Sequence, residues 1–107
     1  MTWSVETLNA AVDAELEALP LDMRARFSRI SVLIASHGLE RVREPYVKHL
    51  EGRLWEMRMS GRDGIARAIY VTARGSRVVV VRVFVKKTEK TPRSEIELAL
   101  RRVEEVR

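Results

Sequence analysis

The residues best suited to chemistry in this chain are cationic, and they gather in its second half. They comprise three arginines on predicted strands and three lysines just after the last strand: Arg58, Arg67, Arg82, Lys86, Lys87 and Lys90. Guanidinium groups bind phosphate through paired hydrogen bonds, and a cluster of them stabilises charge that builds up on phosphorus. Crowded lysines lower one another's pKa, so one of them can exchange a proton near neutral pH. These residue types indicate a phosphate-binding site.

Two tight turns between the predicted strands determine how the arginines line up. A first hairpin centred on residues 62–63 places Arg58 opposite Arg67. A second hairpin closed by residues 74–76 places Arg67 opposite Arg82. Because side chains alternate along a strand, all three guanidinium groups then project from one sheet face, and a slip of one residue in either hairpin would break the row. Like charges opposite each other destabilise a sheet, so such a row makes sense when an anion fills it.

Aromatic side chains near this row are suited to contact a nucleobase. Phe84 shares a sheet face with Arg82 by parity and can stack on a base, whereas Tyr70 faces the other way. Tyr70 and Trp55 are expected in the core. The alternative interpretation of the whole region is a solvated cationic sheet face without a ligand.

The charge distribution supports a polyanionic partner on one side of the molecule. The net charge is +5 with a pI near 10.2, but residues 1–23 carry five acids and no Lys or Arg, whereas residues 53–93 hold eleven Lys and Arg against three acids. There is no cysteine, which excludes disulfides, thiolate metal sites and a cysteine nucleophile and fits a reducing cytosol. No apolar run approaches the length of a membrane span, and no signal peptide is visible.

The first half of the chain reads as a strand and two helices. Residues 2–6 alternate as a short strand, and a helix is predicted over residues 8–19 with Thr7 or Asn9 as its cap. A second helix is predicted from about residue 21 to 36, where Gly38 stops it. Residues 39–52 read as an irregular connector with at most one helical turn.

The second half reads as three strands and a helix. The strands are predicted at residues 53–60, 65–73 and 77–85, and the apolar run at 78–81 is typical of a central strand. A last helix follows, capped by Ser94 or Thr91.

This order predicts an α+β fold. An N-terminal strand and a two-helix hairpin pack on an antiparallel sheet, the three-stranded meander over residues 53–85, and a C-terminal helix ends the chain. The helices are expected on one sheet face. At 107 residues, with no linker or repeat, the chain is expected to be one domain over residues 1–107.

Other catalytic chemistries have little support in the sequence. His37 and His49 are too far apart to indicate a metal motif, and both read more readily as structural. There is no glycine-rich phosphate loop, nucleophile elbow or paired-carboxylate motif. We therefore expect neither a metal nor a cofactor.

Three strings resemble one known toxin family. They are KHLEGRLWEMR at residues 48–58, RAIY at 67–70, and FVKKTEKTP at 84–92 followed by Glu95, Ile96 and Ala99. Together they resemble the phage-derived HigB-like branch of the RelE/ParE toxin superfamily, over nearly the whole chain. The resemblance implies a RelE-like fold and the toxin of a type II toxin–antitoxin system.

The resemblance also implies a reaction and its residues. Such toxins are ribosome-dependent mRNA endoribonucleases (mRNA interferases), in which a ribose 2′-OH attacks the adjacent phosphate without a metal and translation stops. By motif, the expected catalytic residues are Arg58, Arg67 and Lys87. The expected RNA-binding residues are Lys86 and Lys90, to which the reasoning from the strands adds Arg82 and Phe84.

The implied partners are a cognate helix-turn-helix (HigA-like) antitoxin and mRNA on the ribosome, with DNA contacted only through the antitoxin complex. The implied location is cytoplasmic, without a membrane. One departure is that many RelE-type enzymes have a tyrosine in the C-terminal segment, whereas this chain has none after Tyr70. Two other functions stay open: a ParE-like inhibitor of DNA gyrase, and a non-catalytic basic RNA-binding module.

Overall fold

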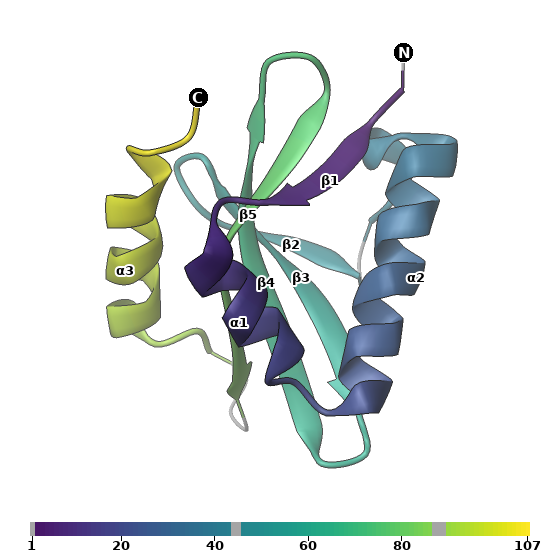
Figure 1. Cartoon of the computed structure of the whole chain (residues 1–107), viewed down its shortest axis with the longest axis vertical. Coiled ribbons are helices and arrows are strands. Elements are labelled where there is room, and N and C mark those ends of the chain that lie inside the picture. Colours follow the sequence, from purple (N-terminus) through teal and green to yellow (C-terminus); the bar gives the residue numbers. More distant parts are fainter. Residues whose placement is uncertain (1, 44–45, 87–89) are drawn as a thin grey trace.

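A five-stranded sheet forms the centre of the computed structural model, which describes residues 2–43, 46–86 and 90–107 (Figure 1). The strand order is β1-β5-β4-β3-β2. The strands are β1 (Ser4–Thr7), β2 (Val47–Glu51), β3 (Leu54–Gly61), β4 (Gly64–Ala73) and β5 (Arg77–Lys86). β1 pairs with β5 in parallel, and the other neighbours are antiparallel. The predicted α+β class, the N-terminal strand and the meander are confirmed.

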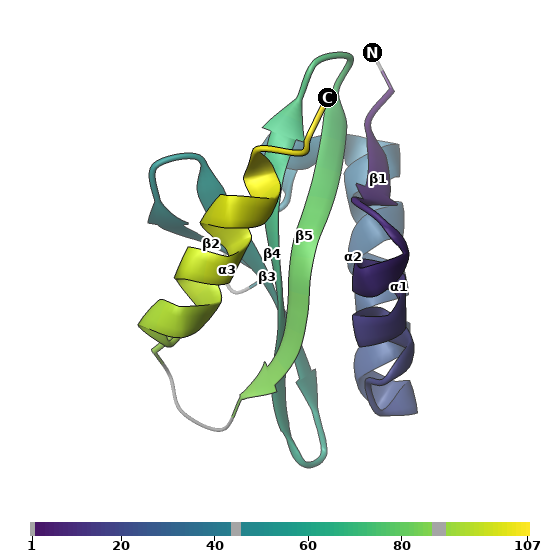
Figure 2. The same ribbon diagram turned by 60° about the vertical axis from the view of Figure 1, so that its left-hand side comes forward.

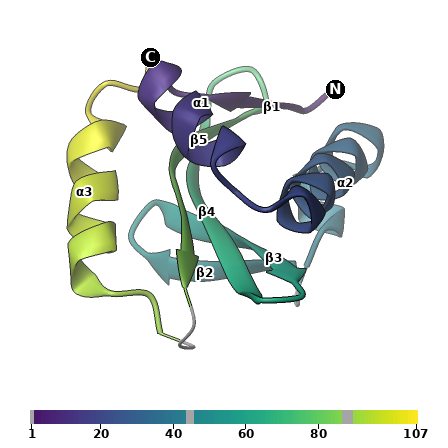
Figure 3. The same cartoon turned by 60° about the horizontal axis from the view of Figure 1, so that its bottom comes forward.

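The helices cover both faces of this sheet. They are α1 (Ala10–Glu17), α2 (Leu21–His37), the short 3-10 helix η1 (Leu39–Arg41) and α3 (Arg93–Val103). α1 and α2 lie on one face and α3 lies on the opposite face (Figures 2 and 3). The prediction that the helices share one face is therefore wrong. None of the helices in the described ranges is long and apolar enough to cross a membrane.

Two hydrophobic cores result, one on each side of the sheet. On the first side, α1 and α2 pack against strand residues that include Met57 and Tyr70. On the second side, Ala99 of α3 belongs to a cluster that includes Leu54 and Ile69. Residues 78–81 are buried throughout, which confirms β5 as a central strand covered on both sides.

Local signals explain where most helices begin and end. Asn9 caps α1 by accepting a hydrogen bond from the Val12 N–H at 3.1 Å, and Gly38 ends α2 at φ 88°, a conformation that favours glycine. The cap predicted for the last helix is wrong, since α3 follows Pro92 without a side-chain cap. The Thr91 hydroxyl bonds to a carboxylate on the sheet instead.

The segment before the meander also differs from the prediction. Residues 39–52 were expected to be irregular, but η1 and β2 form there, and β2 pairs with β3. Lys48 and His49 are exposed on this strand. Because β2 is an edge strand, its polar residues reach water, and the apolar alternation that marks a half-buried strand is weak.

The two hairpins differ in how well their register was predicted. Arg58 lies opposite Arg67, as expected. In the second hairpin Arg67 lies opposite Phe84 and Arg82 lies opposite Ile69, so the predicted Arg67–Arg82 pair is wrong. Two shifts of one residue add up. The turn pairs Ala73 with Arg77, one residue away from the register that the prediction assumed, and a β-bulge on β5 beside Ile69 adds a second residue.

Candidate functional site

Three of the predicted site residues line up across the centre of the sheet. Arg58 on β3, Arg67 on β4 and Phe84 on β5 occupy consecutive cross-strand positions. Because directly paired residues project from the same face, all three point toward the side that α3 covers. Glu56, two residues before Arg58 on β3, shares that face.

The centre of this arrangement is a buried ion pair. Arg67 and Glu56 are each only 1% exposed, and the Arg67 guanidinium donates a hydrogen bond to the Glu56 carboxylate. The other carboxylate oxygen accepts a hydrogen bond from the Thr91 hydroxyl at 2.6 Å. Buried charges of this kind persist when they are paired and hydrogen-bonded. Glu56 thus connects the middle of the sheet to the residues that lead into α3.

Two further cations border the pair. The Arg58 Nε lies 3.8 Å from Glu56 Oε2, and the Arg58 side chain is 25% exposed, so it reaches solvent. Lys86 ends β5. Loss of hydration lowers the pKa of Lys86, the charge of Arg67 lowers it further, and the charge of Glu56 partly opposes both. We name Glu56, Arg58, Arg67 and Lys86 the Arg58 cluster.

A basic groove of about 520 Å³ adjoins the cluster between β2 and α3. Its lining combines the cluster's carboxylate with cations and with residues from both elements: Lys48, His49, Leu50, Glu56, Lys90, Thr91, Arg93 and Ile96. The predicted RNA-binding residue Lys90 therefore lies in the wall of a groove that Glu56 also lines. A groove with this lining is suited to hold a polyanion beside the Arg58 cluster.

Arg82 projects from the same sheet face as the cluster, but its charged partners are different residues. Its guanidinium binds Glu95 at 2.6 Å and Glu15 at 2.9 Å. The hydrogen bond that Arg82 donates to the Glu95 carboxylate is the main cause that raises the pKa of Arg82. Arg82 also lies 5.8 Å from the centre of the Phe84 ring, and Phe84 is 9% exposed. The structure thus brings Arg82 and Phe84 into contacts that link β5 to α1 and α3.

Lys87 and His49 are the other candidates from the sequence. Lys87 lies outside the described residues. His49 Nε2 is 2.9 Å from the Gly52 carbonyl oxygen, and its ring centre is 4.9 Å from that of Trp55. Within the described part of the chain, no three His, Cys, Asp or Glu side chains come together as a metal site.

Sequence reasoning missed Glu56 and Thr91. Glu56 is two residues from Arg58 on one strand, so parity alone places both side chains on one face. The same alternation that groups the arginines therefore also identifies Glu56 as a neighbour of Arg58. The contact with Thr91 joins residues 35 positions apart, and no local pattern reports it.

Comparisons with known proteins agree with this fold. Residues 14–104 match the family described as phage derived protein Gp49-like (DUF891), and the chain belongs to this family. A search of curated proteins found no match.

Two solved structures are similar to this fold. One is the crystal structure of an archaeal RelE–RelB complex from Pyrococcus horikoshii OT3, with a TM-score of 0.60 and 22% identity over 79% of this chain and 96% of that chain. The other is a double mutant of the E. coli toxin RelE in the free state, with a TM-score of 0.63 and 17% identity over 100% of both chains. The fold is RelE-like.

Proposed function

We propose that this protein is the toxin of a type II toxin–antitoxin system and that it cleaves mRNA on the ribosome. The observation that carries the proposal is the Arg58 cluster, in which an accessible arginine and a lysine of lowered pKa adjoin a buried Arg67–Glu56 pair. The RelE-like fold and the Gp49-like family support the same class. The sequence strings described above favour the HigB-like branch.

The proposed reaction needs a base, an acid and stabilisation of charge on phosphorus. The base removes the proton of the ribose 2′-OH, whose oxygen bonds to the adjacent phosphorus while the bond to the 5′-oxygen of the next nucleotide breaks. The acid protonates that 5′-oxygen, which leaves a cyclic phosphate and a 5′-hydroxyl. Each proton transfer and the electrostatic stabilisation contributes its own factor to the rate.

We propose a task for each of the side chains in and near the cluster. Arg58 reaches solvent and would contact the phosphate directly. Lys86 would act as the base, because a lowered pKa increases its neutral fraction near pH 7. Arg67 is buried and would act from behind, by its charge on Lys86 and its hold on Glu56. Of the two lysines that follow β5 in the sequence, Lys87 is the proposed acid that protonates the leaving oxygen, and Lys90 is proposed to bind the RNA.

Partners and location form part of the same proposal. One structural neighbour is described as a RelE–RelB complex, which supports a cognate antitoxin for this chain. We propose a helix-turn-helix, HigA-like antitoxin that links the toxin to DNA, a cytoplasmic location, and one toxin domain over residues 1–107.

The test is to induce the chain in a bacterium and to follow incorporation of labelled amino acids and thymidine together with message integrity. Wild-type protein should stop amino-acid incorporation first, with cleaved messages. Arg58→Ala should reduce cleavage about a hundredfold, the usual scale for lost electrostatic stabilisation. The matched control is Arg74→Ala, which removes an exposed arginine in the turn between β4 and β5.

Other outcomes would overturn the proposal in distinct ways. Early loss of thymidine incorporation with intact messages would indicate a gyrase inhibitor. Purified protein that binds RNA in a salt-dependent manner but never cuts it, on or off ribosomes, would indicate a binding module. Full cleavage by Arg58→Ala would remove the cluster from the mechanism.

A further inference from the structure

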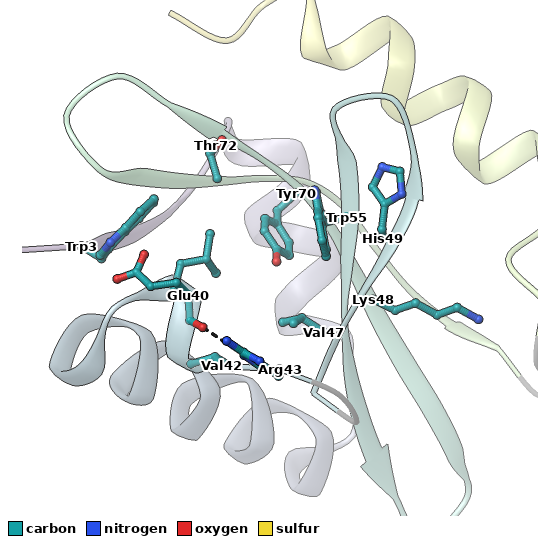
Figure 4. A pocket seen from close by; sticks show the side chains of 11 residues that line it. Trp3, Glu40, Val42, Arg43, Val47, Lys48, His49, Trp55, Tyr70 and Thr72 are labelled. Carbon is teal, nitrogen blue, oxygen red and sulfur yellow. Dashed lines mark hydrogen bonds between the residues drawn. The ribbon is translucent and has the colours of Figure 1, made fainter.

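A second cavity lies away from the Arg58 cluster, on the sheet face that carries α1 and α2. It has a volume of about 590 Å³ and opens beyond the end of α2, where η1, the N-terminal segment, β2 and the end of β4 meet (Figure 4). Its walls include Leu39, Val42 and Val47. A cavity of this size with mainly apolar walls and a few polar groups is typical of a ligand site.

Aromatic side chains dominate this cavity. The chain has two tryptophans, and both line it, together with Tyr70. Trp3 and Trp55 stand on opposite sides of the space (Figure 4). Trp55 is 39% exposed although it was expected in the core. An indole kept partly in water beside a cavity is available to stack on a planar ring.

A hydroxyl group without a partner faces the same space. Tyr70 is 1% exposed, and among the described residues its hydroxyl makes no hydrogen bond. The hydroxyl points into the cavity (Figure 4). Burial raises the pKa of Tyr70 to about 12, so the group stays protonated and can donate. The hydroxyl oxygen is not among the fully buried side-chain atoms that lack a partner, so it is open to the cavity and available to donate to a ligand acceptor.

The cavity and the basic groove adjoin the same edge strand, β2. Lys48 and His49 of β2 line both spaces, and Arg43 adds a second cation to the cavity's lining. A strand of nucleic acid held in the groove would cross β2 at Lys48 and His49 and reach the cavity. Cations that follow a backbone and aromatic rings that receive bases are the two parts of a single-strand binding site.

We propose that this cavity binds one unstacked nucleobase of the RNA whose phosphate lies at the Arg58 cluster, with the ring against Trp55 or Trp3 and the Tyr70 hydroxyl donating to a base acceptor. The inference rests on the proposed function, because it takes RNA as the substrate. It adds a base subsite on the opposite sheet face, reached around β2. The competing occupant is an apolar side chain of a protein partner paired along the free edge of β2.

Intrinsic fluorescence tests this directly, because both tryptophans line the cavity. The probe is a fluorescein-labelled RNA hexanucleotide with 2′-O-methyl sugars, which binds but cannot be cleaved, compared with the same chain carrying abasic sugars. Anisotropy of the label measures binding, and tryptophan emission in unlabelled duplicates measures occupancy of the cavity. The hexanucleotide should bind and quench, whereas the abasic chain should bind about tenfold or more weaker and leave emission unchanged.

Variants separate the ring from the hydroxyl. Trp55→Leu should weaken binding of the hexanucleotide about tenfold and leave the abasic chain unaffected, and Tyr70→Phe should weaken it about threefold to tenfold with quenching retained. Leu100→Ala is the control, since Leu100 is also 39% exposed but lies on α3. Circular dichroism confirms that each variant is folded.

Failure of the base subsite and failure of the proposed function would give different results. If the RNA is cleaved and bound in a salt-dependent manner but emission and the Trp55→Leu affinity do not change, the base subsite is wrong and the proposed function stands. If an uncharged peptide with a central leucine quenches and RNA does not, the cavity is a protein-docking site. If RNA is neither bound nor cut, both proposals fall.

Discussion

The buried ion pair beneath the proposed site makes a quantitative prediction about stability. Breaking a buried pair by removing one partner typically costs about 3–5 kcal/mol, because the remaining charge stays buried. Arg67→Met leaves Glu56 with the Thr91 hydroxyl at 2.6 Å and Arg58 at 3.8 Å, so we expect the lower end, about 3 kcal/mol. Glu56→Met removes the shared acceptor from all three residues, and we expect about 4 kcal/mol.

The double variant should cost much less than the sum of these losses. Replacing a whole buried pair with apolar side chains is often nearly neutral. We expect the Glu56→Met, Arg67→Met protein to lose no more than about 4 kcal/mol, mainly for the unmatched Thr91 hydroxyl and Arg58, against about 7 for additive losses. The coupling energy between the two residues is then at least about 3 kcal/mol.

Urea unfolding followed by circular dichroism measures each corner of this cycle. For a denaturant slope of about 1.5 kcal/mol/M, a loss of 3 kcal/mol moves the midpoint down by about 2 M. The control is Arg93→Ala, which breaks the exposed Arg93–Glu51 pair, 60% and 41% exposed, and should leave the midpoint unchanged. Single variants within about 1 kcal/mol of wild type, or additive losses, would refute the buried pair as the centre of the site.

Two further predictions concern pH. Burial alone would raise the pKa of Glu15, but hydrogen bonds from Arg102 and the Val83 N–H, with the charges of Arg82 and Arg102, lower it overall. Its contribution to stability is therefore present above the unfolded-state pKa and lost as pH falls through the folded value, so Glu15→Gln should flatten the acid limb of a stability–pH curve, and an unchanged limb would contradict this. If Lys86 is the base, the cleavage rate should rise with pH up to its lowered pKa; Lys86→Arg should abolish this rise while RNA binding persists, and an unaltered profile would exclude Lys86.

The Arg58–Arg67 pair could be predicted because it depends only on the short turn that joins β3 and β4. The turn between Arg62 and Asp63 is symmetric, so counting outward from it gives the Arg58–Arg67 pair. The same counting fails for Arg82. The turn itself pairs Ala73 with Arg77, one residue away from the assumed register, and the bulge on β5 falls at Val81, the last of four valines at residues 78–81. Identical apolar residues buried on both faces carry no alternation from which a register shift could be read.

The parts that could not be predicted depend on distant contacts. Arg82 looked available for RNA, yet Glu15 of α1 and Glu95 of α3 both bind it. Those carboxylates come from helices on opposite faces of the sheet, and the sequence did not reveal that α3 crosses over. Trp55 looked like a core residue by type, but the sheet turns it toward the cavity beyond α2.

The buried carboxylate also bears on which proposed function the site favours. A module that only binds RNA gains affinity from every unpaired cation, and Glu56 cancels one of them at the centre of the cluster. In exchange, Glu56 holds the buried Arg67 guanidinium on the central strand and lies 3.8 Å from Arg58 on the neighbouring strand, so Arg67 is already in place before the proposed substrate binds. Fixed charges act most strongly on charge that develops during reaction, whereas tight binding of the ground state adds nothing to the rate of that step. We therefore propose that the cluster gives up affinity for orientation, which supports the proposed catalyst over the binding module.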